Sequence, residues 1–174
     1  MIHRVVITGA ESTGKTTLAQ ALASYYSEPW TEEYVRNYVD RLDRSLQPED
    51  LEPIARGQLT TEDAKLEQAR RLIIHDTNIM SFIVYARHYF NAELDWVNQS
   101  FKERNYSLYM LCAPDIPWES DPSQRDSPEA REQLYDIFKT QLKSLKLPHL
   151  EIQGSKEGRL QQAVTIINKM LQHR

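Results

Sequence analysis

Residues Gly9 to Thr16 have the composition and spacing of a phosphate-binding loop. They read GAESTGKT and match the pattern G-x-x-x-x-G-K-[ST], in which backbone N–H groups of a turn point at one anion. Glycine at positions 9 and 14 would let the backbone turn and approach a phosphate where a Cβ would block it. Lys15 would place its charge on the outer phosphates, and the Thr16 hydroxyl would ligate Mg²⁺. We therefore predict nucleoside triphosphate binding with Mg²⁺ through Gly9, Glu11, Ser12, Thr13, Gly14, Lys15, Thr16 and Thr17.

The segments around this loop indicate how it is positioned. An apolar run at 5–7 predicts a buried strand before the loop, and residues 17–23 have a helical pattern after it. Strand and helix patterns then alternate along the chain, which is typical of a parallel sheet covered on both faces. We expect an α/β fold of the P-loop kinase type, with five parallel strands, helices on both faces and a lid over about 115–131, in one domain spanning 1–174. The expected strands are 3–8, 29–33, 71–75, 107–112 and 149–153, and the expected helices are one ending near 26, then 34–46, 49–71, 80–89, 94–104, 128–145 and 160–171.

Asp76 ends the apolar run at 72–75. Ligands in parallel α/β sheets bind at the carboxyl ends of the strands, so Asp76 is expected to reach the Mg²⁺ region directly or through water. A competing interpretation is that Asp76 caps the next helix, a task that Asn78 would also serve.

The segment from Glu32 to Arg36 closes the second expected strand and opens a helix. An acceptor hydroxyl needs a base or a fixed hydrogen-bond acceptor, and a transferred phosphoryl group needs positive charge. Glu33 and Arg36 are spaced so that both can lie on one helix face. The competing interpretation is a solvated helix N-terminus rich in acids. Neighbouring side chains on an extended segment point to opposite sides, so only one of Glu32 and Glu33 can face an acceptor.

Two further segments are candidates for nucleotide or substrate contact. The Pro-, Asp- and Ser-rich stretch at 115–128 predicts a lid, whose arginines would neutralise the charge of the transferring phosphoryl group while the lid excludes water. The alternative for each of these arginines is a plain charge on a surface helix. Trp118 would stack on an aromatic ring of a ligand or pack the lid base. The loop at 154–159 would wrap the adenine and ribose, or form a plain turn and helix cap. The residues concerned are Trp118, Asp121, Arg125, Arg131, Gly154, Ser155 and Arg159.

Composition narrows the class of protein. The 174 residues carry a formal net charge of −4 and no Lys/Arg run, which disfavours nucleic-acid binding. The sequence lacks a signal peptide and any apolar stretch of transmembrane length, so we expect a cytoplasmic protein that contacts no membrane. Cys112, the only cysteine, ends an apolar run and is expected to be a buried structural thiol. The segment 168–171 departs from the guanine-specifying N-K-x-D pattern, which disfavours a GTPase switch.

Taken together, these segments resemble the ribosylnicotinamide kinase family, the kinase module of the bacterial NAD-biosynthesis regulator. The resemblance covers nearly the whole chain. It departs from the family pattern at Asn37, Asn78 and Pro122, and the shifted spacing around Pro122 weakens the assignment of the lid arginine. The matching motifs are GAESTGKTTLA at 9–19, EYVR at 33–36, IARGQ at 54–58, DTN at 76–78, LYMLCAPDIPWESD at 108–121 and GSKEGR at 154–159.

The resemblance implies MgATP-dependent phosphorylation of the ribose 5′-hydroxyl of nicotinamide riboside, giving nicotinamide mononucleotide. From the length of the chain we expect a stand-alone kinase. Two alternatives stay open: another nucleoside or small-metabolite kinase on the same scaffold, and a nucleotide-binding regulatory module without acceptor chemistry. The implied catalytic residues are Lys15, Glu33, Arg36, Asp76 and Arg125. The implied metal site is Thr16 with Asp76, and the implied substrate contacts are Glu33, Tyr34, Arg36, Asp76, Trp118 and Asp121.

Overall fold

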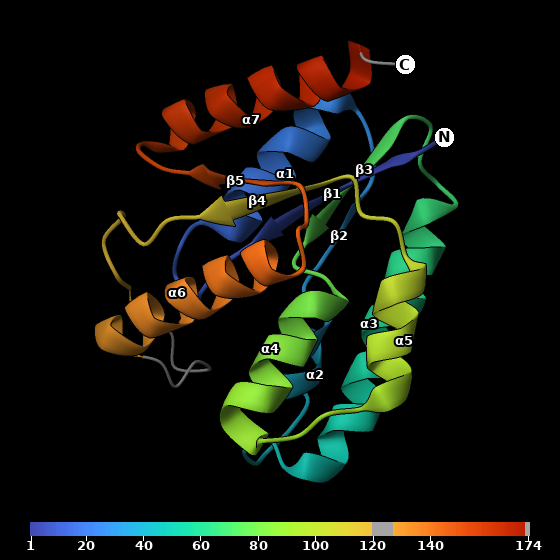
Figure 1. Ribbon diagram of the computed structural model, residues 1–174, viewed down its shortest axis with the longest axis vertical. Coiled ribbons are helices and arrows are strands. Elements are labelled where there is room, and N and C mark those ends of the chain that lie inside the picture. The colour runs from blue at the N-terminus through green and yellow to red at the C-terminus, as the bar shows by residue number, and fades with distance from the viewer. Residues whose placement is uncertain (120–126, 173–174) are drawn as a thin grey trace.

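The computed structural model describes residues 1–119 and 127–172. Its centre is one five-stranded sheet in the order β2-β3-β1-β4-β5, with every neighbouring pair parallel (Figure 1). This confirms the predicted fold class. The strands are β1 (His3–Thr8), β2 (Trp30–Thr31), β3 (Leu72–Asp76), β4 (Leu108–Cys112) and β5 (His149–Ile152).

Helices cover both faces of the sheet (Figure 1). Successive strand side chains point to opposite faces, so Val5 and Ile7 pack with α1 (Lys15–Tyr26) and α7 (Lys156–Gln172). Val6 lies in the second core, with apolar side chains of the remaining long helices. Those helices are α3 (Leu51–Leu66), α4 (Ile79–Phe90), α5 (Asp95–Glu103) and α6 (Pro128–Ser144). Cys112 is fully buried, as the sequence predicts.

The predicted helix at 34–46 is wrong in length, because α2 comprises only Tyr34–Val39. The buried carboxylate of Asp50 organises the chain that follows. It accepts two hydrogen bonds from the Arg44 guanidinium, at 2.7 and 2.9 Å, and one from the Gln47 amide at 2.7 Å. The Tyr38 hydroxyl donates to it as well. These bonds hold residues 40–47 as a loop that leads into a short 3₁₀ turn, η1 (Pro48–Asp50), and then into α3.

The predicted helix at 49–71 is also too long, because α3 ends at Leu66. Beyond the helix, the amides of Arg70 and Arg71 donate to the buried Glu28 carboxylate at 3.0 and 3.1 Å, which turns the chain toward β3. α7 begins four residues earlier than the predicted 160. The other bounds agree within two residues of the prediction.

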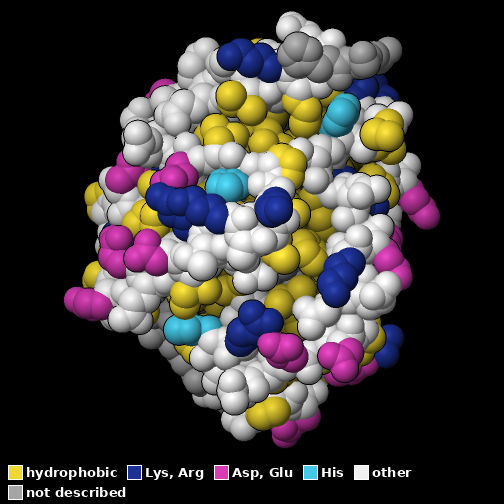
Figure 2. Space-filling model, in the orientation of Figure 1, with side chains coloured by type: hydrophobic (Ala, Val, Ile, Leu, Met, Phe, Trp, Pro, Cys, Tyr) yellow, Lys and Arg dark blue, Asp and Glu magenta, His cyan; other side chains and the backbone are white. Residues whose placement is uncertain are grey.

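The surface is mixed in character. In Figure 2, positively and negatively charged side chains are interspersed with apolar ones on the face shown. Within residues 1–119 and 127–172, every helix is too short or too polar to cross a membrane.

Candidate functional site

The phosphate-binding loop connects β1 to α1 and has the backbone that its glycines were predicted to allow. Gly9 has φ +135° and Gly14 has φ +79°, both in the region that L side chains rarely adopt. A Cβ on Gly9 would lie 3.0 Å from the Cys112 carbonyl oxygen, so the loop passes too close to β4 for a side chain there. Gly14 is the residue that caps the N-terminus of α1, where helix N–H groups favour an anion.

Lys15 is buried and folds back over this loop. Its Nζ donates to the Ala10 carbonyl oxygen at 2.7 Å, and the Thr13 hydroxyl donates to the same oxygen at 2.7 Å. The ammonium group therefore lies against the loop that would surround a phosphate. The Ala10 carbonyl would retain the Thr13 bond if Lys15 turned to a bound nucleotide.

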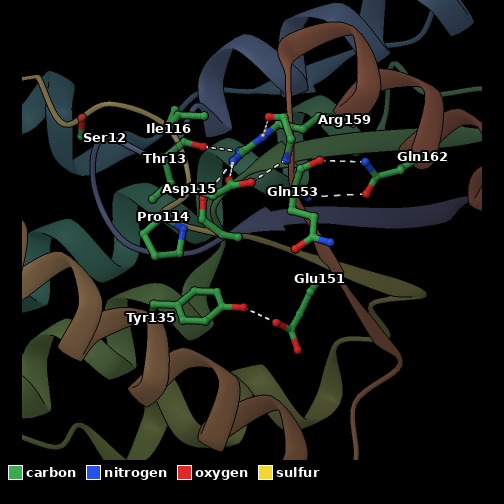
Figure 3. A network of polar contacts seen from close by, with 12 residues as sticks. Ser12, Thr13, Pro114, Asp115, Ile116, Tyr135, Glu151, Gln153, Arg159 and Gln162 are labelled. Atoms are coloured by element: carbon green, nitrogen blue, oxygen red, sulfur yellow. Dashed lines mark hydrogen bonds and ion pairs between the residues drawn. The ribbon is translucent and has the colours of Figure 1, made fainter.

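Arg159, on α7, binds the backbone of the phosphate-binding loop (Figure 3). Only 4% of this residue is exposed, and its guanidinium donates to the Thr13 carbonyl oxygen at 2.6 Å and to the Ala113 carbonyl oxygen at 2.9 Å. It also forms an ion pair with Asp115 and donates through Nε to the Gly154 carbonyl oxygen. With these donors committed to protein oxygens, Arg159 is placed to shape the loop. Direct contact with a nucleotide, as the sequence suggested, stays a prediction.

Arg131, at the start of α6, makes a similar set of contacts with the loop and with the segment that follows β4. Its guanidinium donates to the Ser12 carbonyl oxygen at 3.2 Å, the Ile116 carbonyl oxygen at 3.0 Å and the Pro114 carbonyl oxygen at 3.1 Å. Carbonyl oxygens of consecutive loop residues are thus bound by two buried arginines, which adds positive charge close to the predicted phosphate site.

At 154–159 the structure shows a helix cap. The Ser155 hydroxyl accepts a hydrogen bond from the Gly158 amide at 3.1 Å, and the Gly154 amide donates to Asp115 at 2.6 Å. The cap explains why α7 begins at Lys156, earlier than predicted. Nucleotide contact by Gly154 and Ser155 stays a prediction.

Asp76 lies where the sequence predicted, at the end of β3 and beside α1. The Thr16 hydroxyl donates to Asp76 Oδ2 at 2.5 Å. The competing interpretation of Asp76 as a helix cap is wrong, because the Asn78 side chain caps α4 by accepting from the Met80 amide at 3.2 Å. Burial raises the pKa of Asp76, while Lys15 and the Thr16 hydroxyl oppose that effect.

These two residues fit a magnesium ion. Asp76 Oδ1 is buried and has no hydrogen-bond partner among the described residues, so one carboxylate oxygen still has its ligating capacity. A hydroxyl and a carboxylate oxygen are the hard donors that Mg²⁺ prefers when it also binds nucleotide phosphates. Thr16 and Asp76 would hold the ion, which would neutralise charge on the phosphates.

We expect Asp76→Asn to raise the Mg²⁺ requirement more than it weakens nucleotide binding in the absence of metal. The amide keeps the size of the side chain but removes the charge that a hard cation favours. Calorimetric titration of a non-hydrolysable ATP analogue with and without Mg²⁺ measures both effects. Asp136→Asn, at an exposed carboxylate on α6, is the control. An unchanged Mg²⁺ dependence in Asp76→Asn would contradict the assignment.

A cleft of about 690 Å³ lies beside this loop, bounded by α2, the loop at 40–46, α3 and α4. Glu33 and Arg36 line it, as do polar residues just after β3. Its other wall is aromatic, and the Tyr85 and Tyr89 rings stack with centroids 5.9 Å apart and planes 6° apart. The aromatic residues of this wall are Phe82, Tyr85, Tyr89 and Phe90. The arrangement suits a planar apolar group bound next to charged residues.

Of the two adjacent acids, Glu33 lines this cleft and Glu32 does not. Glu32 is exposed and accepts a hydrogen bond from Asn37 at 3.3 Å. Glu33 is half-buried at the N-cap of α2 and makes no capping bond of its own, so its carboxylate is available to a ligand. Burial is the main cause that raises the pKa of Glu33 above its ordinary value, with Asp76 acting in the same direction and Lys15 and Arg36 in the opposite one.

The structure does not bring every predicted substrate residue to the cleft. Tyr34 packs on α3, where a Cβ added to Gly57 would lie 2.0 Å from its ring. Trp118 is half-buried and is absent from the described residues that line the cleft. Asp121 and Arg125 lie outside the described residues. Sequence reasoning missed the aromatic wall of α4, whose residues recur at helical spacing; that signal existed, but it is equally typical of core packing.

Comparison with known proteins supports this picture. The family model AAA_28, described as an AAA domain, matches residues 4–159. The chain is 25% identical over 178 residues to the trifunctional NAD biosynthesis/regulator protein NadR of Salmonella typhimurium. That alignment covers 98% of this chain but only 43% of the regulator. The match confirms the resemblance predicted from the motifs.

Solved structures confirm the P-loop kinase fold. A NadR protein in complex with NAD and AMP-PNP, and one in complex with NR, superpose with TM-scores of 0.83 at 21% and 22% identity. Each covers 99% of this chain and 50% of the solved chain. Thymidylate kinase from Ehrlichia chaffeensis has a TM-score of 0.68 at 15% identity, with 95% of this chain and 98% of that chain covered.

Proposed function

This chain belongs to the AAA-domain family, and we propose that it is a kinase that transfers the terminal phosphoryl group of ATP to the ribose 5′-hydroxyl of nicotinamide riboside. The observation that carries the proposal is the cleft beside the phosphate-binding loop, with Glu33 and Arg36 on one wall and aromatic side chains on the other. A module that only binds a nucleotide has no need of a separate cleft beside the phosphate-binding loop.

The residues divide the reaction between them. Backbone N–H groups of the loop and Lys15 would bind the phosphates, and Glu33 would accept the hydrogen bond of the 5′-hydroxyl and orient it for in-line attack. The hydroxyl oxygen bonds to the terminal phosphorus as the bond to the ADP oxygen breaks, and the hydroxyl proton passes to Glu33. Arg36 would stabilise the charge of the transferring group.

The charge of the cleft supports a cationic acceptor. Glu33, Asp40 and Asp43 line it together with Arg36 and Arg44, and Arg44 is already paired with Asp50. Among the described residues that line the cleft, the acids thus outnumber the basic side chains without an ion-pair partner, which favours the positively charged pyridinium ring of nicotinamide riboside over a neutral base. The aromatic wall offers stacking and cation–π contact to the same ring. A NadR protein has been solved in complex with NR, which further supports this choice.

A panel of nucleosides tests the proposal. ATP consumption is measured with nicotinamide riboside, uridine, cytidine, thymidine and deoxyadenosine, and the phosphorylated product is identified by mass spectrometry. We expect nicotinamide riboside to be turned over with the highest kcat/KM, because only its base carries a positive charge. Preference for a different nucleoside would support kinase activity but would refute nicotinamide riboside as the acceptor. ATP binding without acceptor-stimulated consumption would favour the regulatory module.

A further inference from the structure

Gln58 and Glu62 form a buried polar pair on α3, and the proposed chemistry assigns neither side chain a task. Their exposed fractions are 4% and 1%. Gln58 Nε2 donates to Glu62 Oε1 at 2.9 Å, one helical turn further along. A buried carboxylate costs free energy unless it is well hydrogen-bonded, so its presence next to the cleft, which Gln58 lines, calls for a physical reason.

Gln58 fixes the start of α2. Its Oε1 accepts a hydrogen bond from the Tyr34 amide at 3.3 Å. The first N–H groups of a helix have no partner within the helix, and here Gln58 supplies one from a neighbouring element. The bonded amide belongs to the peptide group that joins Glu33 to Tyr34. Gln58 therefore constrains the backbone that carries the proposed acceptor-binding carboxylate.

Glu62 fixes the start of α4 in the same way. Its Oε1 also accepts from the Ile79 amide at 3.1 Å, and its Oε2 accepts from the Tyr106 hydroxyl at 2.6 Å. The turn just before Ile79 contains Thr77 with φ +63°, a conformation that a β-branched residue rarely adopts. That turn follows Asp76 directly, so Glu62 holds in place the segment that carries the proposed metal-binding carboxylate.

We propose that Gln58 and Glu62 act as one positioning unit that sets the Glu33 segment and the Asp76 segment relative to each other. The inference rests on the proposed function only for the tasks of those two carboxylates. Each end of the pair binds a backbone amide that helix geometry leaves without a partner, and the Gln58–Glu62 hydrogen bond joins the two ends. Misplacement of reacting groups by about 1 Å can lower turnover roughly 10²-fold, which is the reason for a rigid link.

Amide hydrogen exchange in the protein without ligand tests the link independently of activity. In Gln58→Met, exchange at the Tyr34 amide should accelerate roughly fivefold, the ratio that corresponds to one lost hydrogen bond. If the pair acts as a unit, the Ile79 amide should also accelerate, because Glu62 loses its partner and shifts. Gln68→Met, at an exposed glutamine just after α3, should leave both amides unchanged. Acceleration at Tyr34 alone, or at neither amide, would overturn the proposal.

Kinetics separate positioning from a purely structural role. With the acceptor that the nucleoside panel identifies, Gln58→Met should lower kcat roughly tenfold or more, while the KM for ATP changes less than about twofold. Glu62→Gln keeps an oxygen for the Gln58 and Ile79 donors and should retain kcat within about threefold. If Gln58→Met lowers ATP affinity, kcat and thermal stability together, the pair has only a structural role and the proposed positioning role is refuted. If the wild type accepts no nucleoside, the proposed function fails and amide exchange still decides this inference.

Discussion

Lys15→Ala is expected to lower kcat/KM by roughly 10²–10³-fold, the size of effect seen when one donor to a transferring group is removed. The ammonium lies against the phosphate-binding loop and is not part of the apolar core. The Ala10 carbonyl, its present partner, keeps the hydrogen bond from the Thr13 hydroxyl when Lys15 is truncated. The fold should therefore survive the change, and thermal unfolding should report a melting temperature close to that of wild type.

Steady-state kinetics and nucleotide titration on the same preparations provide the measurement. Lys169→Ala removes an exposed lysine from α7 and serves as the control. Turnover of Lys15→Ala within tenfold of wild type would refute the mechanism assigned to the loop.

Glu33→Gln is expected to lower kcat with nicotinamide riboside by roughly 10²-fold or more, with little change in ATP affinity. The amide preserves the size of the side chain, removes its charge and can present a donor to the 5′-hydroxyl. Loose phosphoryl-transfer transition states depend less on a base than acyl transfer does, so the lower end of the usual range applies. Steady-state kinetics with varied acceptor and varied ATP separate the two effects.

Glu32→Gln is the matched control, because Glu32 is the adjacent acid, is exposed and is bound by Asn37. Glu32→Gln should change kcat only slightly. A large loss of kcat in Glu32→Gln would mean that the acceptor approaches from the other side of the segment. If neither variant is affected, Asp76 becomes the next candidate base.

The pH profile offers a second readout of the same variant. Burial raises the pKa of Glu33 above its ordinary value of 4.5. Because the proposed role needs the ionised carboxylate, kcat/KM should fall as the pH drops through this raised pKa, and the acidic limb should lie above 4.5. Glu33→Gln has no group to titrate there and should lose that limb.

Features that depend on residues close together in the sequence were predictable from the sequence. The loop from Gly9 to Thr16 has its spacing, its glycine conformations and its flanking strand and helix encoded within a few positions, and all are present in the structure. The alternation of strands and helices predicted the parallel sheet. The place of Asp76 followed from the rule that ligands meet parallel strands at their carboxyl ends.

The tertiary structure decided what depends on partners distant in the sequence. The end of α2 depends on Asp50, a residue beyond the helix whose carboxylate accepts hydrogen bonds from Tyr38 and Arg44. No local pattern in 34–46 predicts these contacts. Arg159 reaches the Thr13 carbonyl oxygen across 146 positions, and no local pattern in the sequence predicted that it would support the loop in this way. Strand alternation alone left Glu32 and Glu33 open, the family resemblance implied Glu33, and the tertiary structure places Glu33 on the cleft. Local hydrogen bonds and periodicity are set by neighbouring residues, whereas buried polar groups take whichever partner the folded chain brings within reach.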